Sequence, residues 1–491
     1  MDKGKNIEKT SRYPGIVPFN TDQSHLFFGR NTDVESLFQQ IRRQQTVVLY
    51  GKSGLGKSSL INAGILPKCT TNNLHSPLVF RFNAWTDRSV FTLLEITKNL
   101  IVQHFHEATF LDHLLPNDHS LWYYIKTWQL VSKKYPLLIF DQFEELFSYP
   151  EEQIIEFQKE LAEVLFSNIP LRFIRMADKS SLLLTEDEEA LENEIKTRVV
   201  FAIRSDRMHL LDRFKGNFPS ILRNTYELKA LKRADAYSAI VEPAKIKGQY
   251  TTHVYQYTPA AIEKLLNFLE DKKDAEGRIE GILLQMLCEY YDTFQVKAKG
   301  VKVLDLPAIG NPELVVKKYY ADKISDLSKS EQLPARRLIE EGLVSDGGMR
   351  ITLHESFISQ EYNITRKLLG ELVNRRLLRT EPFIRGGYNF ELSHDRLVPP
   401  VLQARHERKV EESAKQVEEK QKEQQQKLEA LTKQALLESK LREKAEKGEA
   451  QARQRTRLAV GISIFALLLA CLSGVFFLRS QVSEQKALNA K

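Results

Sequence analysis

The stretch Y-G-K-S-G-L-G-K-S-S, from Tyr50 to Ser59, decides the fold of this chain. It matches the phosphate-binding pattern G-x-x-x-x-G-K-[ST] without a mismatch. The run T-V-V-L-Y that leads into it predicts a buried strand, and the run S-L-I-N-A-G-I-L that follows predicts a helix. In this context backbone N–H groups face phosphate oxygens and the helix N-terminus favours negative charge. The sequence therefore predicts a nucleoside triphosphate site, the alternative being a glycine turn that fits by chance.

The residues of this loop have separate expected roles. Lys57 is expected to reach the β- and γ-phosphates, and the Ser58 hydroxyl to bind Mg²⁺. The predicted nucleotide-binding residues of the loop are Gly51, Lys52, Ser53, Gly54, Leu55, Gly56, Lys57, Ser58 and Ser59. The expected ligands are ATP or ADP with Mg²⁺.

A second motif, Y-P-L-L-I-F-D-Q-F-E-E-L-F, runs from Tyr135 to Phe147. Its apolar residues 137–140 end in Asp141, which is typical of a buried parallel strand that carries a carboxylate at its C-terminal edge. Ligands of open α/β sheets bind at this edge, so Asp141 is expected to hold Mg²⁺ near the phosphates. The alternative is an acidic cap on the next helix.

Hydrolysis requires a group that orients or deprotonates water, and Glu144 and Glu145 are the candidates. We favour Glu144, although either residue is also compatible with a solvated first helical turn. Gln142 follows Asp141 where many P-loop ATPases carry an acid, so slow hydrolysis is expected. Arg204 ends the predicted strand V-V-F-A-I-R and is the candidate sensor of the γ-phosphate, with a structural ion pair as the alternative.

Strands that alternate with helices after such a loop predict an α/β fold with a parallel sheet covered on both faces. The second strand is expected at Leu78–Trp85. The expected organisation is a polar tail (1–11), a P-loop NTPase domain (12–245), a helical domain (246–330), a winged helix (331–404), a long charged helix or coiled coil (405–457), a transmembrane helix (458–478) and a short tail (479–491).

The winged-helix expectation rests on two predicted helices followed by a hairpin that turns at Gly386 and Gly387. Its second helix is basic, with Arg366, Lys367, Arg375 and Arg376. Binding of DNA is one interpretation, and an internal packing module with a solvated basic face is the other. We prefer packing, and do not expect nucleic acid as a partner, because no strongly basic wing accompanies the helix.

Composition and hydropathy place the chain at a membrane. The net charge of +7 is mild for 491 residues, and three dispersed cysteines predict no disulfide framework. The uncharged run Leu458–Leu478 just spans a hydrocarbon core of ~30 Å. Three arginines precede this run, so the positive-inside rule places the part before residue 458 in the cytoplasm. The helix expected at 405–457 carries an interrupted apolar repeat, and is either a weak coiled coil or a single charged helix.

Taken together, these motifs resemble the STAND ATPases, and most of all the bacterial novel STAND NTPases. The resemblance covers about residues 12–404 and is carried by P-F-N…F-F-G-R, the phosphate loop, D-Q-F-E-E-L-F, R-S-D and E-L-K-A-L…I-V-E-P-A. It implies that Phe28, Gly29 and Arg30 pack near adenine and that Pro243 contacts the base, although Glu242 replaces a usual glycine. It also implies that His394, in S-H-D, touches the β-phosphate of ADP.

The apolar run and its flanking arginines predict a single-pass membrane protein with a cytoplasmic NTPase part, and the resemblance implies that the membrane is the bacterial inner (plasma) membrane. It is expected to act as a switch that ADP holds closed, that ATP·Mg²⁺ opens into a homo-oligomer, and that slow ATP hydrolysis resets. An unknown sensor or effector protein is expected as a partner, because family members often carry sensor repeats beyond this region. A membrane-tethered DNA-binding regulator and a transport or remodelling ATPase are the alternatives.

Overall fold

The structure is a computed structural model, and it describes residues 10–82, 91–105, 109–114, 117–166, 169–177, 185–270, 274–375, 377–382, 387–393 and 397–488. The chain divides into two units, Met1–Arg405 and His406–Lys491. The first unit contains every strand described below, and the second is part of one helix.

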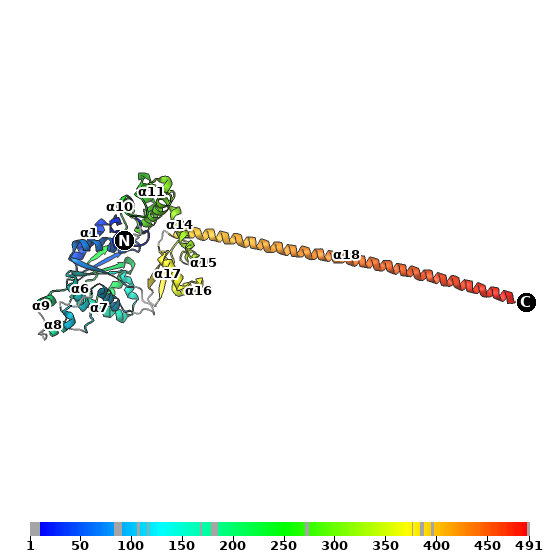
Figure 1. The fold of residues 1–491 in the computed structure, drawn as a ribbon, viewed down its shortest axis with the longest axis horizontal. Helices are drawn as coiled ribbons and strands as arrows, with labels where there is room; N and C mark the ends of the chain where they lie inside the picture. The colour runs from blue at the N-terminus through cyan, green and yellow to red at the C-terminus, as the bar shows by residue number, and fades with distance from the viewer. Residues whose placement is uncertain are drawn as a thin grey trace, which may run out of the picture. The chain divides into compact units, whose positions relative to one another are not determined.

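A five-stranded sheet is the centre of the first unit (Figure 1). Its strand order is β2-β3-β4-β1-β5, and every pairing is parallel. The predicted α/β fold with a parallel sheet is therefore confirmed. The strands are β1 (Thr46–Gly51), β2 (His75–Arg81), β3 (Tyr135–Asp141), β4 (Arg198–Arg204) and β5 (Thr225–Glu227).

Helices cover both faces of this sheet because its central strands are apolar on both sides. Leu137 and Ile139 of β3 pack with α1 and η2, whereas Leu138 and Phe140 pack with α4, α6 and α7. The helices of this region are η1 (Thr21–Leu26), α1 (Asn31–Arg43), α2 (Lys57–Ser59), η2 (Leu60–Ile65), α3 (Leu66–Asn72), α4 (Leu93–His104), α5 (Leu111–Leu114), α6 (Leu121–Ser132), η3 (Phe143–Ser148), α7 (Glu151–Phe166), α8 (Leu171–Ala177), α9 (Thr185–Glu192) and η4 (Ser205–Phe214).

The second strand differs from its prediction. It begins at His75 rather than Leu78 and ends at Arg81, and residues 83–85 of the predicted strand lie outside the described part of the chain. The early start includes Pro77, which lacks an N–H donor. A proline is tolerated here because β2 is an edge strand of the sheet.

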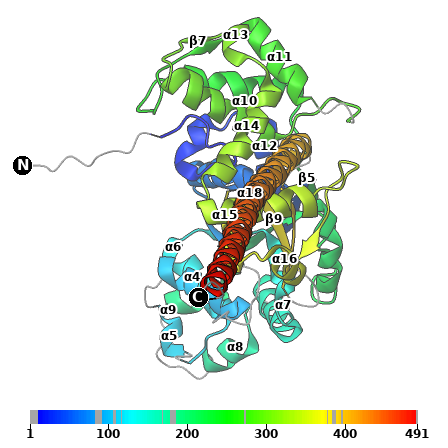
Figure 2. The ribbon, with the colours of Figure 1, turned by 90° about the vertical axis from the view of Figure 1, so that its right-hand side faces the viewer.

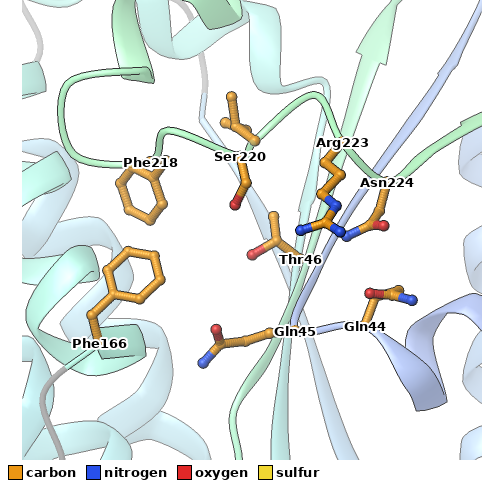
Figure 3. Close-up of a pocket in the computed structure, with 9 residues that line it drawn as sticks. Gln44, Gln45, Thr46, Phe166, Phe218, Ser220, Arg223 and Asn224 are labelled. Carbon is orange, nitrogen blue, oxygen red and sulfur yellow. The ribbon is translucent and has the colours of Figure 1, made fainter.

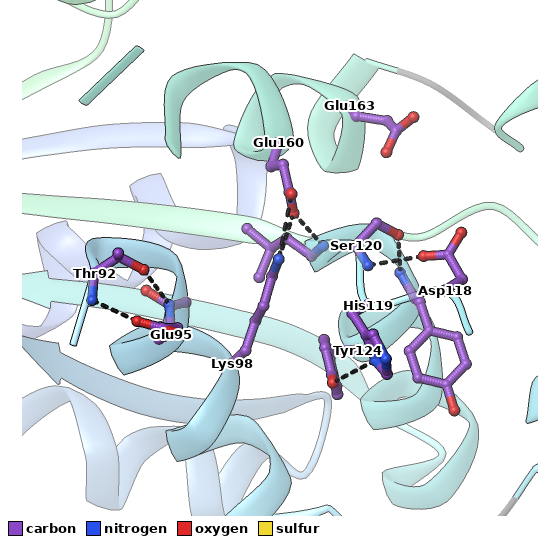
Figure 4. A network of polar contacts seen from close by, with 12 residues as sticks. Thr92, Glu95, Lys98, Asp118, His119, Ser120, Tyr124, Glu160 and Glu163 are labelled. Atoms are coloured by element: carbon purple, nitrogen blue, oxygen red, sulfur yellow. Dashed lines mark hydrogen bonds and ion pairs between the residues drawn. The ribbon is translucent and has the colours of Figure 1, made fainter. Parts of the chain in front are cut away.

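A polar network ties together the helices on the face that carries α4, α6 and α7 (Figure 4). Glu160 of α7 accepts a bond from Lys98 of α4 at 3.2 Å and from the backbone N–H of Leu121 at the start of α6. Ser120 caps α6 by accepting from the N–H of Tyr123 at 3.2 Å. These bonds satisfy helix-end donors and partly buried charges, so the network has a structural role.

The chain after the sheet is mostly helical and shares one hydrophobic cluster from α10 to the start of α18. In Figures 1 and 2, α11 lies on the opposite side of this unit from α8. The elements are α10 (Arg233–Lys245), β6 (Gln256–Tyr257), α11 (Pro259–Leu269), α12 (Gly281–Tyr291), η5 (Asp292–Lys297), β7 (Val303–Leu304), α13 (Leu306–Ile309), α14 (Pro312–Ser325), α15 (Lys329–Arg337), η6 (Leu338–Gly342), β8 (Leu353–His354), α16 (Glu355–Tyr362), α17 (Arg366–Asn374), β9 (Leu378–Pro382), β10 (Tyr388–Leu392) and α18 (Val398–Leu488).

Residues 329–405, which we call the C-terminal module, combine helices with a small antiparallel sheet of order β8-β10-β9. Helix α17 begins after Thr365, whose hydroxyl accepts a bond from the N–H of Leu368 at 3.2 Å. Strand β9 follows α17 and pairs with β10, placing Arg379 opposite Glu391. Gly387, one of the two glycines of the expected turn, has φ +81°, whereas Gly386 lies outside the described residues.

Helix α18 carries the apolar run 458–478. By length and composition it is the helix of the described chain that is able to cross a membrane. Its leucine, isoleucine, valine and phenylalanine side chains in this run are more than half exposed. The same helix begins in the C-terminal module, where the Arg405 guanidinium donates to the Val344 carbonyl at 2.8 Å.

Candidate nucleotide-binding site

A cavity of about 540 Å³ lies at the carboxyl ends of β1, β3 and β4. The phosphate loop forms one part of its wall, and residues of the C-terminal module form another. The lining residues are Gly15–Phe19, Phe27, Phe28, Arg30, Ser53–Ser59, Asp141, Gln142, Glu144, Glu145, Arg204, Arg207, Leu231, Ala239, Gly281, Ile282, Leu284, Gln285, Val373, Asn374, Leu378, Arg379, Thr380 and Ser393.

The phosphate loop has the backbone that its glycines allow. Gly54 and Gly56 have φ of +79° and +94°, a region that glycine enters without strain. Gly51 approaches the next strand so closely that a Cβ would lie 2.6 Å from the Leu228 carbonyl oxygen. The Lys57 ammonium donates to the carbonyls of Gly51 and Lys52 at 2.8 and 3.2 Å. The lysine is thus held at the mouth of the loop, where a phosphate would take over these bonds.

Lys57 lies among the carboxylates that the sequence predicted for the site. Burial lowers the pKa of Lys57, and the negative charges of Glu144 and Asp141 oppose this effect. An ammonium that has lost part of its hydration is a stronger partner for an anion than one in water. The phosphate half of the cavity therefore contains a cation already placed for a ligand.

Asp141 ends β3 and is 1% exposed. Its Oδ2 accepts from the Nε of Arg81 at 2.9 Å, and its Oδ1 accepts from the N–H of Gln142 at 3.1 Å. Gln142 has φ +58°, a left-handed conformation that is uncommon for a non-glycine residue and recurs at functional sites. This turn directs η3, with Glu144 and Glu145, into the cavity.

The donors present fit Mg²⁺. The described residues hold no cluster of three or more His, Cys, Asp or Glu side chains able to bind a metal. Mg²⁺ normally binds one or two protein oxygens together with phosphate oxygens and water, rather than a complete protein cage. Ser58 and Asp141 both line the cavity and supply such oxygens.

Glu144 and Glu145 have different surroundings, although they are neighbours in η3. The Oε2 atom of Glu144 is buried and has no hydrogen-bond partner among the described residues. Burial raises the pKa of Glu144, and the charges of Lys57 and Arg204 oppose the rise. Burial, together with the charge of Glu145, raises the pKa of Tyr388 in β10 to about 12. Glu144 therefore lies by the phosphate loop, whereas Glu145 lies by the C-terminal module.

Arg204 and Arg30 both line the cavity but are already bonded. Arg204 donates to Asp206 from Nε at 3.1 Å and from Nη2 at 2.8 Å. Arg30 donates to the carbonyls of Leu55 and Lys229 at 2.9 and 2.8 Å. Arg30 therefore connects the phosphate loop to the segment after β5, which is a bracing role beside its expected place near adenine.

Gly29 allows the segment that precedes α1 to approach α10 closely. Its φ is +80°, and a Cβ built there would lie 2.3 Å from the Asp235 carbonyl oxygen. We expect Gly29→Ala to lower the free energy of unfolding by roughly 3 kcal/mol, because it adds backbone strain to an overlap with rigid backbone.

The matched control is Gly370→Ala, which lies inside helix α17 with no atom within 4 Å of the added Cβ. This variant should be stabilised by about 0.5–1 kcal/mol, since alanine is the better helix former. Urea unfolding followed by circular dichroism measures both changes. Equal stability of the two variants would contradict the packing described for Gly29.

Four residues predicted for the site, Gly29, Gly51, Lys52 and Pro243, are not among the described residues that line the cavity, and a fifth, His394, is not described. Pro243 lies in α10, and the described lining residues do not include it; its carbonyl accepts from Arg12 at 2.8 Å. Ala239, one turn earlier in α10, lines the cavity in its place. His394 lies outside the described residues, although the adjacent Ser393 lines the cavity.

Sequence reasoning missed the first turns of α12 and strand β9. Gly281, Ile282 and Gln285 of α12 line the cavity, and a Cβ on Gly54 would lie 3.4 Å from Ile282. The available signal was the strongly apolar helix itself. The close approach to the loop occurs at Gly54, whereas a Cβ added to Gly281 would have no atom within 4 Å. The sequence around Arg379 of β9 did not indicate a place in the cavity, because no local pattern shows which side of the C-terminal module lines the nucleotide site.

A second cavity, of about 330 Å³, lies at the amino ends of β1 and β5 (Figure 3). Amides and hydroxyls line it, together with Arg223 and two phenylalanines. Its described lining contains no carboxylate and no histidine, so it lacks the acid–base groups of the first cavity.

Parallel sheet, phosphate loop and strand-end carboxylate define a P-loop NTPase. The family model of the novel STAND NTPase 1 family matches residues 13–436. The chain belongs to this family, and the resemblance seen in the sequence is confirmed.

Comparison with solved structures gives distant similarities. The Aeropyrum pernix ORC2 protein, solved as ADPNP-ADP complexes, is 17% identical with a TM-score of 0.39, covering 77% of this chain and 93% of that one. The A. pernix ORC1 protein in complex with DNA is 13% identical with a TM-score of 0.39 and the same coverage. A Walker-type ATPase of Pyrococcus abyssi is 14% identical with a TM-score of 0.38, covering 78% and 97%. No curated protein matches the sequence.

Proposed function

We propose that this protein is a membrane-anchored nucleotide switch, closed with ADP and open with ATP·Mg²⁺. One observation carries the proposal: the cavity that holds the phosphate loop is completed by β9, α17 and Ser393 of the C-terminal module. A nucleotide in this cavity contacts both parts of the wall. Its binding energy is then linked to the docking of the module, which is the requirement for a ligand to shift a conformational equilibrium.

The site residues of the proposal follow from the geometry. Lys57 and the loop N–H groups bind the phosphates, and Arg204 senses the γ-phosphate after leaving Asp206. Ser58 and Asp141 would hold Mg²⁺, which would neutralise phosphate charge. Glu144 takes the proton of the attacking water, since its carboxylate is buried in the cavity with Lys57 and burial raises its pKa above the usual glutamate value. Turnover is slow in this proposal, because Glu144 is the single general base and Gln142 stands where many P-loop ATPases carry an acid.

The C-terminal module acts in the proposal as a packing module of winged-helix type rather than as a DNA reader. Arg366 pairs with Glu355, and Arg375 pairs with Asp326 at 3.5 Å. Lys367 lies 4.0 Å from Glu371 of its own helix, and Arg376 lies outside the described residues. Acidic partners in the same unit reduce the positive potential that phosphate backbones require, which disfavours the DNA-binding regulator.

The remaining parts of the proposal concern α18 and assembly. The segment 458–478 spans the inner membrane with the NTPase part in the cytoplasm, and residues 405–457 form the stalk, alone or as a weak coiled coil. The domain boundaries proposed from the sequence are kept. ATP·Mg²⁺ promotes self-association, and a sensor or effector protein engages the open state.

The test is the mass of the full-length protein in detergent, with ADP and with a non-hydrolysable ATP analogue plus Mg²⁺. We expect tightly bound ADP after purification, a monomer with ADP, and a larger species with the analogue. Steady, fast turnover without a mass change would favour a transport or remodelling ATPase. A protein that is monomeric and nucleotide-free under all conditions would contradict the switch.

A further inference from the structure

Arg379 is a cation of the nucleotide cavity that comes from outside the NTPase sheet. It lies in β9 of the C-terminal module, lines the cavity together with Lys57, and is 22% exposed. Strand β9 also contacts η3, the segment that carries Glu144. Arg379 therefore shares one cavity with Lys57 and the phosphate loop.

The guanidinium of Arg379 is held in a specific orientation. Its Nε donates to Oε1 of Glu391, the residue opposite it in β10. Glu391 is 10% exposed and also accepts from the Thr352 hydroxyl at 3.4 Å, so this carboxylate is itself fixed. Fixing Nε leaves the two terminal nitrogens as a preoriented fork.

That fork has no hydrogen-bond partner among the described residues, in contrast to the terminal nitrogens of Arg204 and Arg30, which line the same cavity. Arg204 uses Nη2 on Asp206, and Arg30 uses both terminal nitrogens on an aspartate and backbone carbonyls. Guanidinium forks bind phosphate oxygens through two parallel charge-assisted bonds. The partly buried and oriented guanidinium of Arg379 is therefore suited to bind a phosphate group in this cavity.

We propose that Arg379 binds the terminal phosphate of a nucleoside diphosphate and so fastens the C-terminal module over the occupied site, with Glu391 as its positioning residue. This inference rests on the proposed function, because it takes the docked arrangement to be the diphosphate state. Opening the module for a triphosphate removes Arg379 from the phosphates, so the residue selects between the two nucleotides. Its contact favours one state only, as a switch requires.

Arg379→Gln in the full-length protein tests this selection. We expect ADP to bind roughly 10- to 100-fold more weakly, because a charge-assisted bidentate contact is lost. Binding of the non-hydrolysable ATP analogue with Mg²⁺ should change by less than about 3-fold, the effect of a lost weak contact. Titrations with fluorescent forms of both nucleotides measure the ratio of the two affinities.

Three further variants separate phosphate binding from folding. Arg375→Gln removes another ion-paired arginine of the same module that does not line the cavity, and should leave the affinity ratio unchanged. Arg379→Lys keeps the charge without the fork and should recover part of the ADP affinity. The double variant Arg379→Gln/Glu391→Gln avoids an unpaired buried carboxylate, and should show the same selective loss of ADP affinity as Arg379→Gln.

The results that would contradict the role of Arg379 differ from those that would contradict the proposed switch. An equal loss for both nucleotides, a larger loss for the triphosphate, or no change in the folded double variant would overturn the role of Arg379 while leaving the switch intact. If the unmodified protein binds neither nucleotide, and Lys57→Ala behaves like it, the switch and the role of Arg379 fail together.

Discussion

Lys57→Ala is expected to weaken the binding of both ADP and ATP by at least about 100-fold. Lys57 forms charge-assisted bonds to two phosphates, each of which contributes roughly 1.5–3 kcal/mol, and ~2.7 kcal/mol already corresponds to a 100-fold change. Its ammonium is held at the mouth of the loop by the Gly51 carbonyl at 2.8 Å. The substitution therefore removes a placed cation rather than a flexible one.

Lys52→Ala is the matched control, since Lys52 belongs to the same loop but is exposed and is not a cavity-lining residue. The nucleotide affinity of Lys52→Ala should fall by only a few-fold, because Lys52 carries an exposed charge. Circular dichroism should show both variants folded, because Lys57 gives up a partly buried charge rather than an apolar contact. If Lys57→Ala bound ADP and ATP as tightly as the unmodified protein, the assignment of this cavity as the nucleotide site would be wrong.

Glu144→Gln is expected to reduce ATP hydrolysis by about 100- to 1,000-fold while leaving nucleotide binding nearly unchanged. General-base catalysis contributes on this scale, and glutamine keeps the size of the side chain but cannot accept the proton. Glu145→Gln should retain most of the activity, because Glu145 lies by Tyr388 of the C-terminal module. A single-turnover assay with radiolabelled ATP measures these rates. The reverse pattern would move the base to Glu145.

The same substitution has a pH-dependent effect on stability. Burial raises the pKa of Glu144 in the folded state, so the folded protein holds this proton more tightly than the unfolded chain. The stabilisation is complete below the usual glutamate pKa and is lost as the pH rises through the raised value. Nucleotide-free Glu144→Gln should therefore be more stable than the unmodified protein at neutral pH, and this difference should shrink toward pH 4. A difference in stability between the two proteins that does not change with pH would contradict the burial of the Glu144 carboxylate.

The sequence predicts the sheet and its phosphate loop well because their signals are local. A β-branched run before Gly51 and an apolar run before Asp141 each determine their own strand, and the parallel rule brings their ends together. The early start of β2 was missed because Pro77 reads as a breaker, and only the position at the edge of the sheet tolerates it.

The rest of the site depends on contacts between distant segments. Arg379 lines the same cavity as the phosphate loop, and β9 packs on η3, but no feature within β9 reveals this neighbour. Pro243 shows the converse problem. A motif-like proline in α10 suggested a base contact, whereas Ala239, one turn earlier on the same face of the helix, lines the cavity, and the Pro243 carbonyl accepts from Arg12.

Hydrogen exchange at β9 tests the central claim most directly, namely that the C-terminal module closes the nucleotide cavity with ADP and leaves it with ATP·Mg²⁺. The peptide containing Leu378–Pro382 would be followed in the full-length protein with no nucleotide, with ADP, and with a non-hydrolysable ATP analogue plus Mg²⁺. We predict the slowest exchange with ADP and the fastest with the analogue. Identical exchange in all three states, with both nucleotides shown to be bound, would contradict the switch.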